Sequence, residues 1–151
     1  MAFFLDHQSL RLENGLSGFS VRITTGNPLN FYQAISEPQS IETVEIWAQL
    51  FQPSSEKSSL VIVVPGSLGL SESHIFKAKL LTDAGFAVCL MDPFGERGVE
   101  STVRNQAQYS FAASAWDILC AVDFLSTLKG VDPARIGIQG HSRGGSAALL
   151  A

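Results

Sequence analysis

The feature that most constrains the fold of this chain is a run of apolar, mostly β-branched residues at positions 60–64. A strand of this composition is typical of a parallel sheet that helices cover on both faces. A second apolar run follows at 86–91, and a shorter strand is predicted at 135–139. Apolar side chains recur at helical spacing from Ile75 to Gly85 and over 112–128. Strands that alternate with helices predict an α/β fold with a mostly parallel sheet and flanking helices.

The chain changes character near residue 40. Residues 1–40 combine scattered apolar residues with turn signals, which suggests one or two short strands, such as 19–23. From Ile41 the side chains alternate with a period of two until Gln52-Pro53, which is typical of a half-buried strand. We therefore divide the chain into an N-terminal leader, residues 1–40, and an α/β domain, residues 41–151.

Composition excludes several classes of protein. Of the 151 residues, 46% are hydrophobic and 16% are charged, so the chain folds around a core rather than staying disordered. Ten basic residues against fourteen acidic ones, without a basic run, argue against nucleic acid as a partner. The sequence contains neither a secretory signal nor a stretch that could span a bilayer, which predicts a soluble, cytoplasmic protein without a membrane partner. Cys89 and Cys120 lack metal-site spacing and are predicted to be buried thiols.

One motif carries chemistry. The segment Gly140-His-Ser-Arg-Gly-Gly145 follows the third predicted strand and precedes an apolar, helix-forming segment, 146–151. It matches G-x-S-x-G, the nucleophile elbow, in which the serine lies on a tight turn between strand and helix. Such a turn strains the serine backbone and leaves no room for side chains two residues before or after it, hence Gly140 and Gly144. The free N–H groups of the following helix would favour an oxyanion. The alternative is a glycine-rich turn without chemistry.

With this motif the chain resembles the α/β-hydrolase superfamily, and within it the dienelactone hydrolase-like branch of esterases. The resemblance covers about residue 44 to the end of the chain. Besides the elbow, it rests on the Pro-Gly-Ser-Leu-Gly turn at 65–69, on Met-Asp-Pro-Phe-Gly-Glu-Arg-Gly at 91–98, and on the helix that contains Ala-Trp-Asp at 115–117. Many relatives have His-Gly where this chain has Pro65-Gly66.

The resemblance implies a site and a reaction. Ser142 would be the nucleophile and the backbone N–H of Arg143 one oxyanion donor, with Ser67, or the adjacent Leu68, supplying the second backbone N–H. It implies no metal and no organic cofactor. Dienelactone hydrolases proper carry cysteine as the nucleophile, so Ser142 indicates a relative that cleaves a small ester, lactone or thioester through an acyl-enzyme.

The acid and base of a catalytic triad are not present in this chain. In the α/β-hydrolase order Asp or Glu, and then His, follow the serine, but the nine residues after Ser142 contain none of these. We therefore expect the N-terminal part of a longer hydrolase, a truncated fold in which residues 41–151 form a partial α/β-hydrolase domain that is inactive alone. Structural or surface roles are predicted for the upstream His7, His74, His141, Asp117 and Asp123, and a loop or capping role explains Asp92 as well as a catalytic one does.

Several alternatives remain open. Arg97, Glu96 or Arg143 could bind an acidic substrate group, although a weak surface ion pair explains Arg97 equally simply. A dinucleotide site is disfavoured, because Gly66 and Gly69 lack further glycines in register. Within the same fold the enzyme could be an acyltransferase, a thioesterase or a serine peptidase, and the truncated chain could also be a non-catalytic protein.

Overall fold

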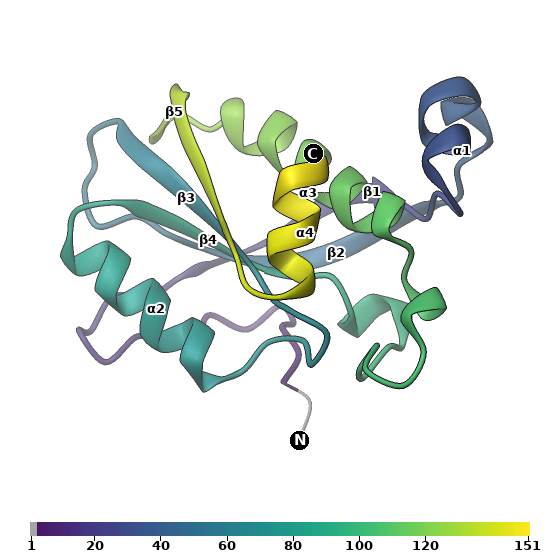
Figure 1. The fold of residues 1–151 in the computed structure, drawn as a ribbon. Coiled ribbons are helices and arrows are strands. Elements are labelled where there is room, and N and C mark those ends of the chain that lie inside the picture. Colours follow the sequence, from purple (N-terminus) through teal and green to yellow (C-terminus); the bar gives the residue numbers. More distant parts are fainter. Residues whose placement is uncertain (1–2) are drawn as a thin grey trace.

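The computed structural model describes residues 3–151 as a five-stranded sheet between two layers of helices (Figure 1). The strands, in the sheet order β1-β2-β4-β3-β5, are β1 (Phe19–Gly26), β2 (Thr43–Phe51), β4 (Ala87–Asp92), β3 (Ser58–Val64) and β5 (Val131–Gly140). The helices are α1 (Phe31–Ser36), α2 (Glu72–Asp83), α3 (Phe111–Ser126) and α4 (Arg143–Leu150). Short 3₁₀ turns lie at η1 (Pro38–Ser40), η2 (Gly95–Arg97) and η3 (Gln106–Gln108).

Four of the five strands point in one direction. β3 pairs in parallel with β4 and β5, whereas β2 is antiparallel to both β1 and β4. Only β2 is therefore reversed among the strands of residues 3–151, which confirms the predicted α/β fold with a mostly parallel sheet. The sheet extends into the N-terminal segment, because β1 pairs with β2 along its whole length, from Phe19 to Gly26.

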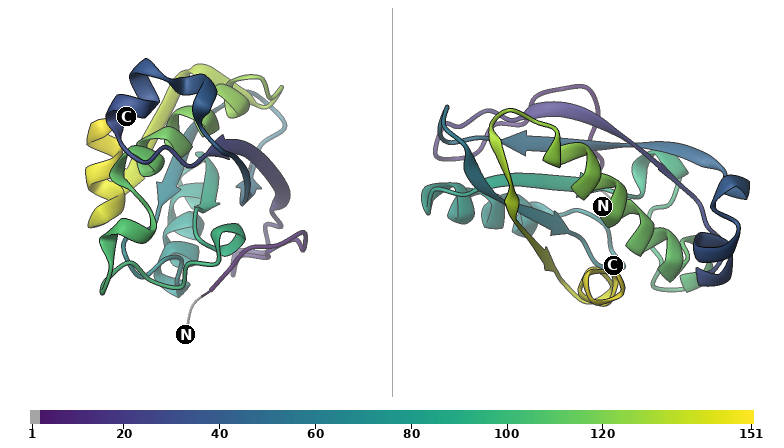
Figure 2. Two further views of the ribbon diagram at one scale, coloured as in Figure 1. Left: turned by 90° about the vertical axis from the view of Figure 1, so that its right-hand side faces the viewer. Right: turned by 90° about the horizontal axis from the view of Figure 1, so that it is seen from above.

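The side chains of the central strands alternate between the two helical layers. In one core cluster the sheet packs against α3 and α4 through Leu60, Ile62, Cys89, Met91, Ile118, Leu125 and Ala147. In the other it packs against α2 and the N-terminal segment through Leu5, Leu12, Val63, Ala78, Val88 and Leu90. Both figures show α2 on one side of the sheet and α3 with α4 on the other (Figures 1 and 2). Burial on two faces, worth about 1.5–3 kcal/mol for each large apolar side chain, accounts for the unbroken apolar runs.

The two long helices end differently. α2 ends at Asp83, two residues before the predicted stop at Gly85. The φ of +93° at Gly85 allows the N–H groups of Gly85 and Phe86 to bond to the carbonyls of Thr82 and Leu81 at 3.0 and 3.1 Å. α3 ends at Ser126, before the predicted end at Leu128, as the final N–H groups bond to carbonyls three residues back. Gly130 has another role, since a Cβ there would lie 2.2 Å from Nε2 of Gln52.

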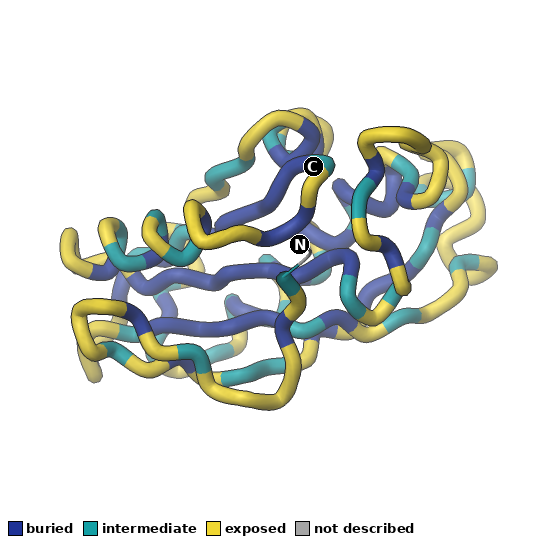
Figure 3. Tube along the Cα trace, turned by 90° about the horizontal axis from the view of Figure 1, so that it is seen from below, coloured by how far each residue is buried: buried dark blue, intermediate teal, exposed yellow. Residues whose placement is uncertain are grey.

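The connections hold structure that the sequence did not predict. α1 lies between β1 and β2, has no buried residue, and is capped by Asn30, whose Oδ1 accepts the N–H of Gln33 at 2.9 Å. The predicted turn at Asp132-Pro133 lies within β5, where the register with β3 shifts. Figure 3 shows the buried residues concentrated along the central strands. No helix in the described part of the chain is long and apolar enough to cross a membrane.

Candidate functional site

The candidate site lies at one edge of the sheet, where β3, β4 and β5 all end. Since these strands are parallel, their carboxyl ends carry three connections to the same edge: the turn 65–69, the loop 93–110 and the elbow 140–145. Crevices at this edge bind ligands in open α/β sheets.

The backbone of Ser142 is strained. Its φ is +53° and its ψ is −120°, and it is the only residue other than glycine with a positive φ among residues 3–151. A conformation of this kind costs on the order of 1–3 kcal/mol and is found mainly at functional sites. α4 begins at the next residue, and the Ser142 carbonyl accepts the N–H groups of Gly145 and Ser146 at 2.9 and 3.1 Å. The serine is thus exposed at the N-terminus of a helix.

Two glycines make this conformation possible. A Cβ at Gly140 would lie 2.2 Å from the carbonyl oxygen of Gly144. A Cβ at Gly144 would lie 2.5 Å from the carbonyl oxygen of Val64, at the end of β3. Contacts this short involve only backbone atoms, so no side-chain movement could relieve them. The elbow therefore requires glycine on both sides of the serine.

A pocket of about 350 Å³ lies between the elbow and the turn 65–69, with Ser67, Leu68, His74, His141 and Ser142 among its lining residues. The turn is closed by the Gly69 N–H, which donates to the Gly66 carbonyl at 3.0 Å. It packs directly on the elbow, because a Cβ at Gly66 would lie 3.3 Å from Cβ of Ser142. The structure thus brings Ser67, Leu68 and Ser142 together.

Arg143 follows Ser142 at the start of α4, and its side chain bonds to the loop 93–110. Its N–H lies in the first turn of α4, where helical N–H groups have no acceptor within the helix. The guanidinium is buried, donates to Oε1 of Gln106 and the carbonyl of Tyr109, and lies 4.2 Å from the ring centroid of Phe111. Burial lowers the pKa of Arg143. This side chain is thus bonded to the loop that precedes α3, and Arg143 is not among the residues that line the pocket beside Ser142.

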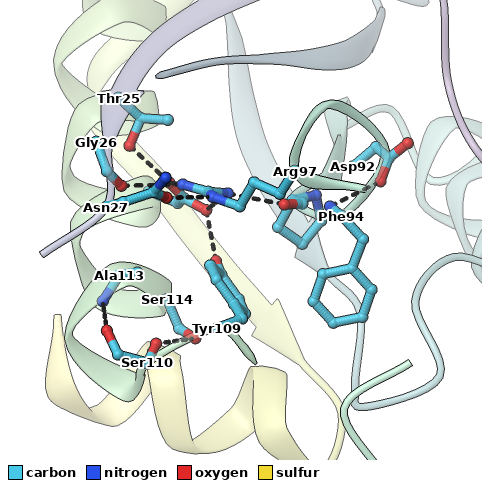
Figure 4. Close-up of polar contacts among 12 residues, drawn as sticks. Thr25, Gly26, Asn27, Asp92, Phe94, Arg97, Tyr109, Ser110, Ala113 and Ser114 are labelled. Atoms are coloured by element: carbon cyan, nitrogen blue, oxygen red, sulfur yellow. Dashed lines mark hydrogen bonds and ion pairs between the residues drawn. The ribbon is translucent and has the colours of Figure 1, made fainter. Parts of the chain in front are cut away.

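Arg97 is also committed to the protein interior (Figure 4). Its guanidinium bonds to both carboxylate oxygens of Asp117 at 2.8 Å, and these side chains are only 4% and 0% exposed. Tyr109 and Thr25 donate to the same carboxylate. Burial acts to lower the pKa of Arg97, but the neighbouring Asp117 raises it overall. The predicted surface ion pair of Arg97 is wrong, because the loop folds back onto α3 and the pair with Asp117 is buried.

Asp92 and His74 stabilise turns near the site. The Asp92 carboxylate accepts the N–H groups of Leu5, Phe94 and Gly95 at 2.7, 3.0 and 3.1 Å, and burial raises its pKa. His74 caps α2, as its Nδ1 accepts the N–H of Ser71 at 3.1 Å. Burial, and then the charge of Lys77, lower the pKa of His74. The predicted capping roles account for both residues.

The Ser142 hydroxyl has no hydrogen-bonded base among residues 3–151. Two histidines line its pocket, but its hydroxyl makes no hydrogen bond to an imidazole or carboxylate of residues 3–151. The contacts of loop 93–110 with the site were not predicted from the sequence. In them Gln106 bonds to Ser67, and the Tyr109 carbonyl accepts a bond from Arg143. No local pattern marks them, because the partners are more than thirty residues apart and the loop has no periodicity.

Comparisons with known proteins agree with this geometry. The pattern of the prolyl oligopeptidase family matches residues 72–151, whereas a search of curated proteins gives no match. A dienelactone hydrolase from Anabaena variabilis ATCC 29413 superposes with a TM-score of 0.63 at 22% identity, over 90% of this chain and 56% of its own. Est1E from Butyrivibrio proteoclasticus superposes with a TM-score of 0.57 at 28% identity, over 72% of this chain and 41% of its own. The chain thus spans about half the length of these structures. Its fold and its sequence pattern together show that it belongs to the prolyl oligopeptidase family, within the α/β-hydrolase fold of the dienelactone hydrolases.

Proposed function

We propose that this chain is the nucleophile-bearing part of a serine hydrolase that cleaves a small carboxylic ester, lactone or thioester. The observation that carries the proposal is the strained Ser142, exposed at the start of α4 and facing the turn 65–69 across one pocket. Strain of this size persists only where the surroundings impose it, and here backbone contacts of Gly140 and Gly144 do so.

The reaction would proceed through an acyl-enzyme. The Ser142 hydroxyl oxygen attacks the carbonyl carbon and gives its proton to a base, and the carbonyl oxygen becomes an oxyanion. The N–H of Arg143 and that of Ser67, or the adjacent Leu68, donate to this oxyanion. When the tetrahedral intermediate collapses, the alcohol or thiol takes the proton and leaves. Water then attacks the acyl group by the same route, which frees the acid and restores Ser142.

The base and the acid that orients it belong, in this proposal, to a part of the enzyme outside residues 1–151. The hydroxyl of Ser142 has no such partner in the described residues, and the chain spans only 56% of the dienelactone hydrolase that it superposes on. Residues 1–151 alone would consequently bind a substrate without turning it over at an enzymatic rate.

The family match favours a second candidate, a serine peptidase. The prolyl oligopeptidase pattern covers 72–151, which includes the elbow and α2. An amide needs protonation of its leaving nitrogen, whereas an activated ester does not. The two candidates therefore differ in the substrate that the same Ser142 would turn over fastest.

The test uses the protein encoded by the complete reading frame that contains this chain. It is assayed with p-nitrophenyl acetate, a short acyl thioester, methyl ferulate and a peptidyl p-nitroanilide, since ferulic acid has been observed bound to Est1E. We expect ester or thioester hydrolysis that Ser142→Ala reduces by at least about 1000-fold. The matched control is Ser146→Ala, an exposed serine of α4, which should keep its activity.

Two other outcomes would contradict the esterase assignment. Activity that survives Ser142→Ala would remove Ser142 as the nucleophile and overturn the proposal. Faster turnover of the p-nitroanilide than of the esters, still dependent on Ser142, would replace the esterase assignment with the peptidase.

A further inference from the structure

One segment, residues 101–109, forms hydrogen bonds to both sides of the candidate pocket. On one side lies the turn that carries Ser67, and on the other lies the helix start that carries Arg143. In the proposed reaction the oxyanion hole consists of the Arg143 N–H and the N–H of Ser67 or of the adjacent Leu68. The spacing between them is then a catalytic variable, because an oxyanion must lie within hydrogen-bond distance of both donors.

The segment holds the turn by three bonds to Ser67. The carbonyl of Ser67 accepts the N–H of Thr102 at 2.8 Å and the hydroxyl of Ser101 at 3.1 Å. The hydroxyl of Ser67 accepts the side-chain amide of Gln106 at 3.4 Å. The two carbonyl bonds hold the peptide plane that follows Ser67, which carries the Leu68 N–H, and the bond from Gln106 holds the Ser67 side chain.

The same segment holds the start of α4 through the side chain of Arg143. One guanidinium nitrogen donates to Oε1 of Gln106 and the other to the carbonyl of Tyr109. The guanidinium also lies over two rings, 4.2 Å from the centroid of Phe111 and 5.2 Å from that of Tyr109. A planar, buried guanidinium that is bonded at two nitrogens and lies close to two aromatic rings has little freedom.

We infer that Gln106 is a positioning residue that sets the spacing of the two oxyanion donors. Its amide is the one side chain of the described residues that bonds to both sides, to Ser67 through Nε2 and to Arg143 through Oε1. It is exposed, so it adds little to the core, and its bridging contacts lie beside the pocket. The inference rests on the proposed function and adds a residue to its machinery.

The chemistry of the bridge says which substitutions should preserve it. Glutamate can accept from the Arg143 guanidinium and from the Ser67 hydroxyl, because a hydroxyl can reverse and donate. Methionine matches the length of glutamine but forms neither bond. Gln106→Glu should therefore keep the bridge, and Gln106→Met should break it.

The test compares these variants in the protein from the complete reading frame. For Gln106→Met we expect kcat to fall about tenfold with KM within about twofold, as the interaction acts in the transition state. Gln106→Glu should restore kcat to within about threefold of the parent. The matched control is Gln108→Met, since within residues 3–151 the amide of Gln108 bonds to the Ser101 and Asn105 carbonyls, at 3.2 and 3.3 Å, and to neither Ser67 nor Arg143.

A double-mutant cycle separates positioning from general loosening of the loop. If Gln106 acts through Ser67, Gln106→Met should have almost no further effect on kcat in a Ser67→Ala background. Equal effects of Gln106→Met in both backgrounds, an unchanged kcat, or a change in KM alone would each overturn the inference. Failure of the proposed function looks different, because a fluorophosphonate probe would then not label Ser142 in the parent protein.

Discussion

At the scale of single residues, the strained backbone of Ser142 lowers the stability of the fold at the residue proposed as the nucleophile. Its backbone has a positive φ that glycine adopts freely, and a serine there stores strain. The surroundings enforce the conformation through two glycines that touch the backbone of β3 and α4. A residue retained in spite of such a cost is a candidate for function.

We therefore predict that Ser142→Gly raises the free energy of unfolding while removing hydrolysis. Relief of strain, less the extra backbone entropy of glycine, should give a gain of about 1 kcal/mol. Urea unfolding followed by circular dichroism measures it. The comparison is Ser146→Gly, in the regular part of α4, which should lose about 0.5 kcal/mol. A loss of stability in Ser142→Gly as well would show that the serine is not strained.

At the scale of elements, buried hydrogen bonds and an ion pair hold the loop between β4 and α3. Arg97 and Asp117 form its anchor, and Tyr109 connects this anchor to Arg143 at the elbow. Burial, and then the adjacent Asp117 carboxylate, raise the pKa of Tyr109, so its hydroxyl remains a donor. Through Tyr109 the loop thus connects Asp117 of α3 with Arg143 at the start of α4.

Breaking this anchor should be costly. Arg97→Met leaves the Asp117 carboxylate buried without its cation, which we expect to lower the free energy of unfolding by about 3–5 kcal/mol. Arg135→Met, which removes a pair with Asp132 at a site 60% exposed, should cost far less. Chemical denaturation of both variants provides the comparison. Equal small losses would show that the buried pair contributes no more than a surface pair.

The cap of α2 should make stability depend on pH. Burial keeps the pKa of His74 below its usual value of 6.5, so the unfolded chain binds a proton more readily than the folded protein. The contribution of neutral His74 to the free energy of unfolding is therefore present above about pH 6.5 and is lost as the pH falls below that value. His74→Gln retains an acceptor for the Ser71 N–H and should flatten the fall in unfolding free energy between pH 6.5 and 5. An unchanged pH profile would remove His74 as its source.

What the sequence predicted, and what it did not, follows from how local each signal is. The runs at 60–64 and 86–91 became β3 and β4, because burial on two faces imposes a composition that a short window reveals. The elbow is equally local, since its glycines lie within two residues of the serine. The pair Arg97–Asp117 joins a loop to a helix 20 residues away, and only tertiary folding brings the two together. α1 escaped prediction because it buries nothing and so lacks an apolar face.

At the scale of the whole molecule, the sheet protects its central strand. Cys89 lies on β4, which has a neighbouring strand on each side, and its exposure is 0%. Burial raises the pKa of its thiol to about 12. Cys120 lies on α3 and is only partly buried.

The two thiols should report unfolding at different depths. With a maleimide or Ellman's reagent, we expect Cys120 to react first and Cys89 only when the whole sheet opens. Mass spectrometry of peptides after timed labelling distinguishes the two sites. In water, the labelling rate of Cys89 should equal the global unfolding rate. This rate should be higher in the Arg97→Met variant. Labelling of Cys89 as fast as that of Cys120 would indicate that β4 opens locally.

The reversal of β2 has a practical consequence. Because β2 runs against β3, their connection at 52–57 lies at the edge of the sheet opposite Ser142. Its residues 53–57 are exposed. Surface loops of this kind tolerate added chain at little cost. A tether attached to this loop would hold the molecule on a solid support with the edge that carries Ser142 facing the solution.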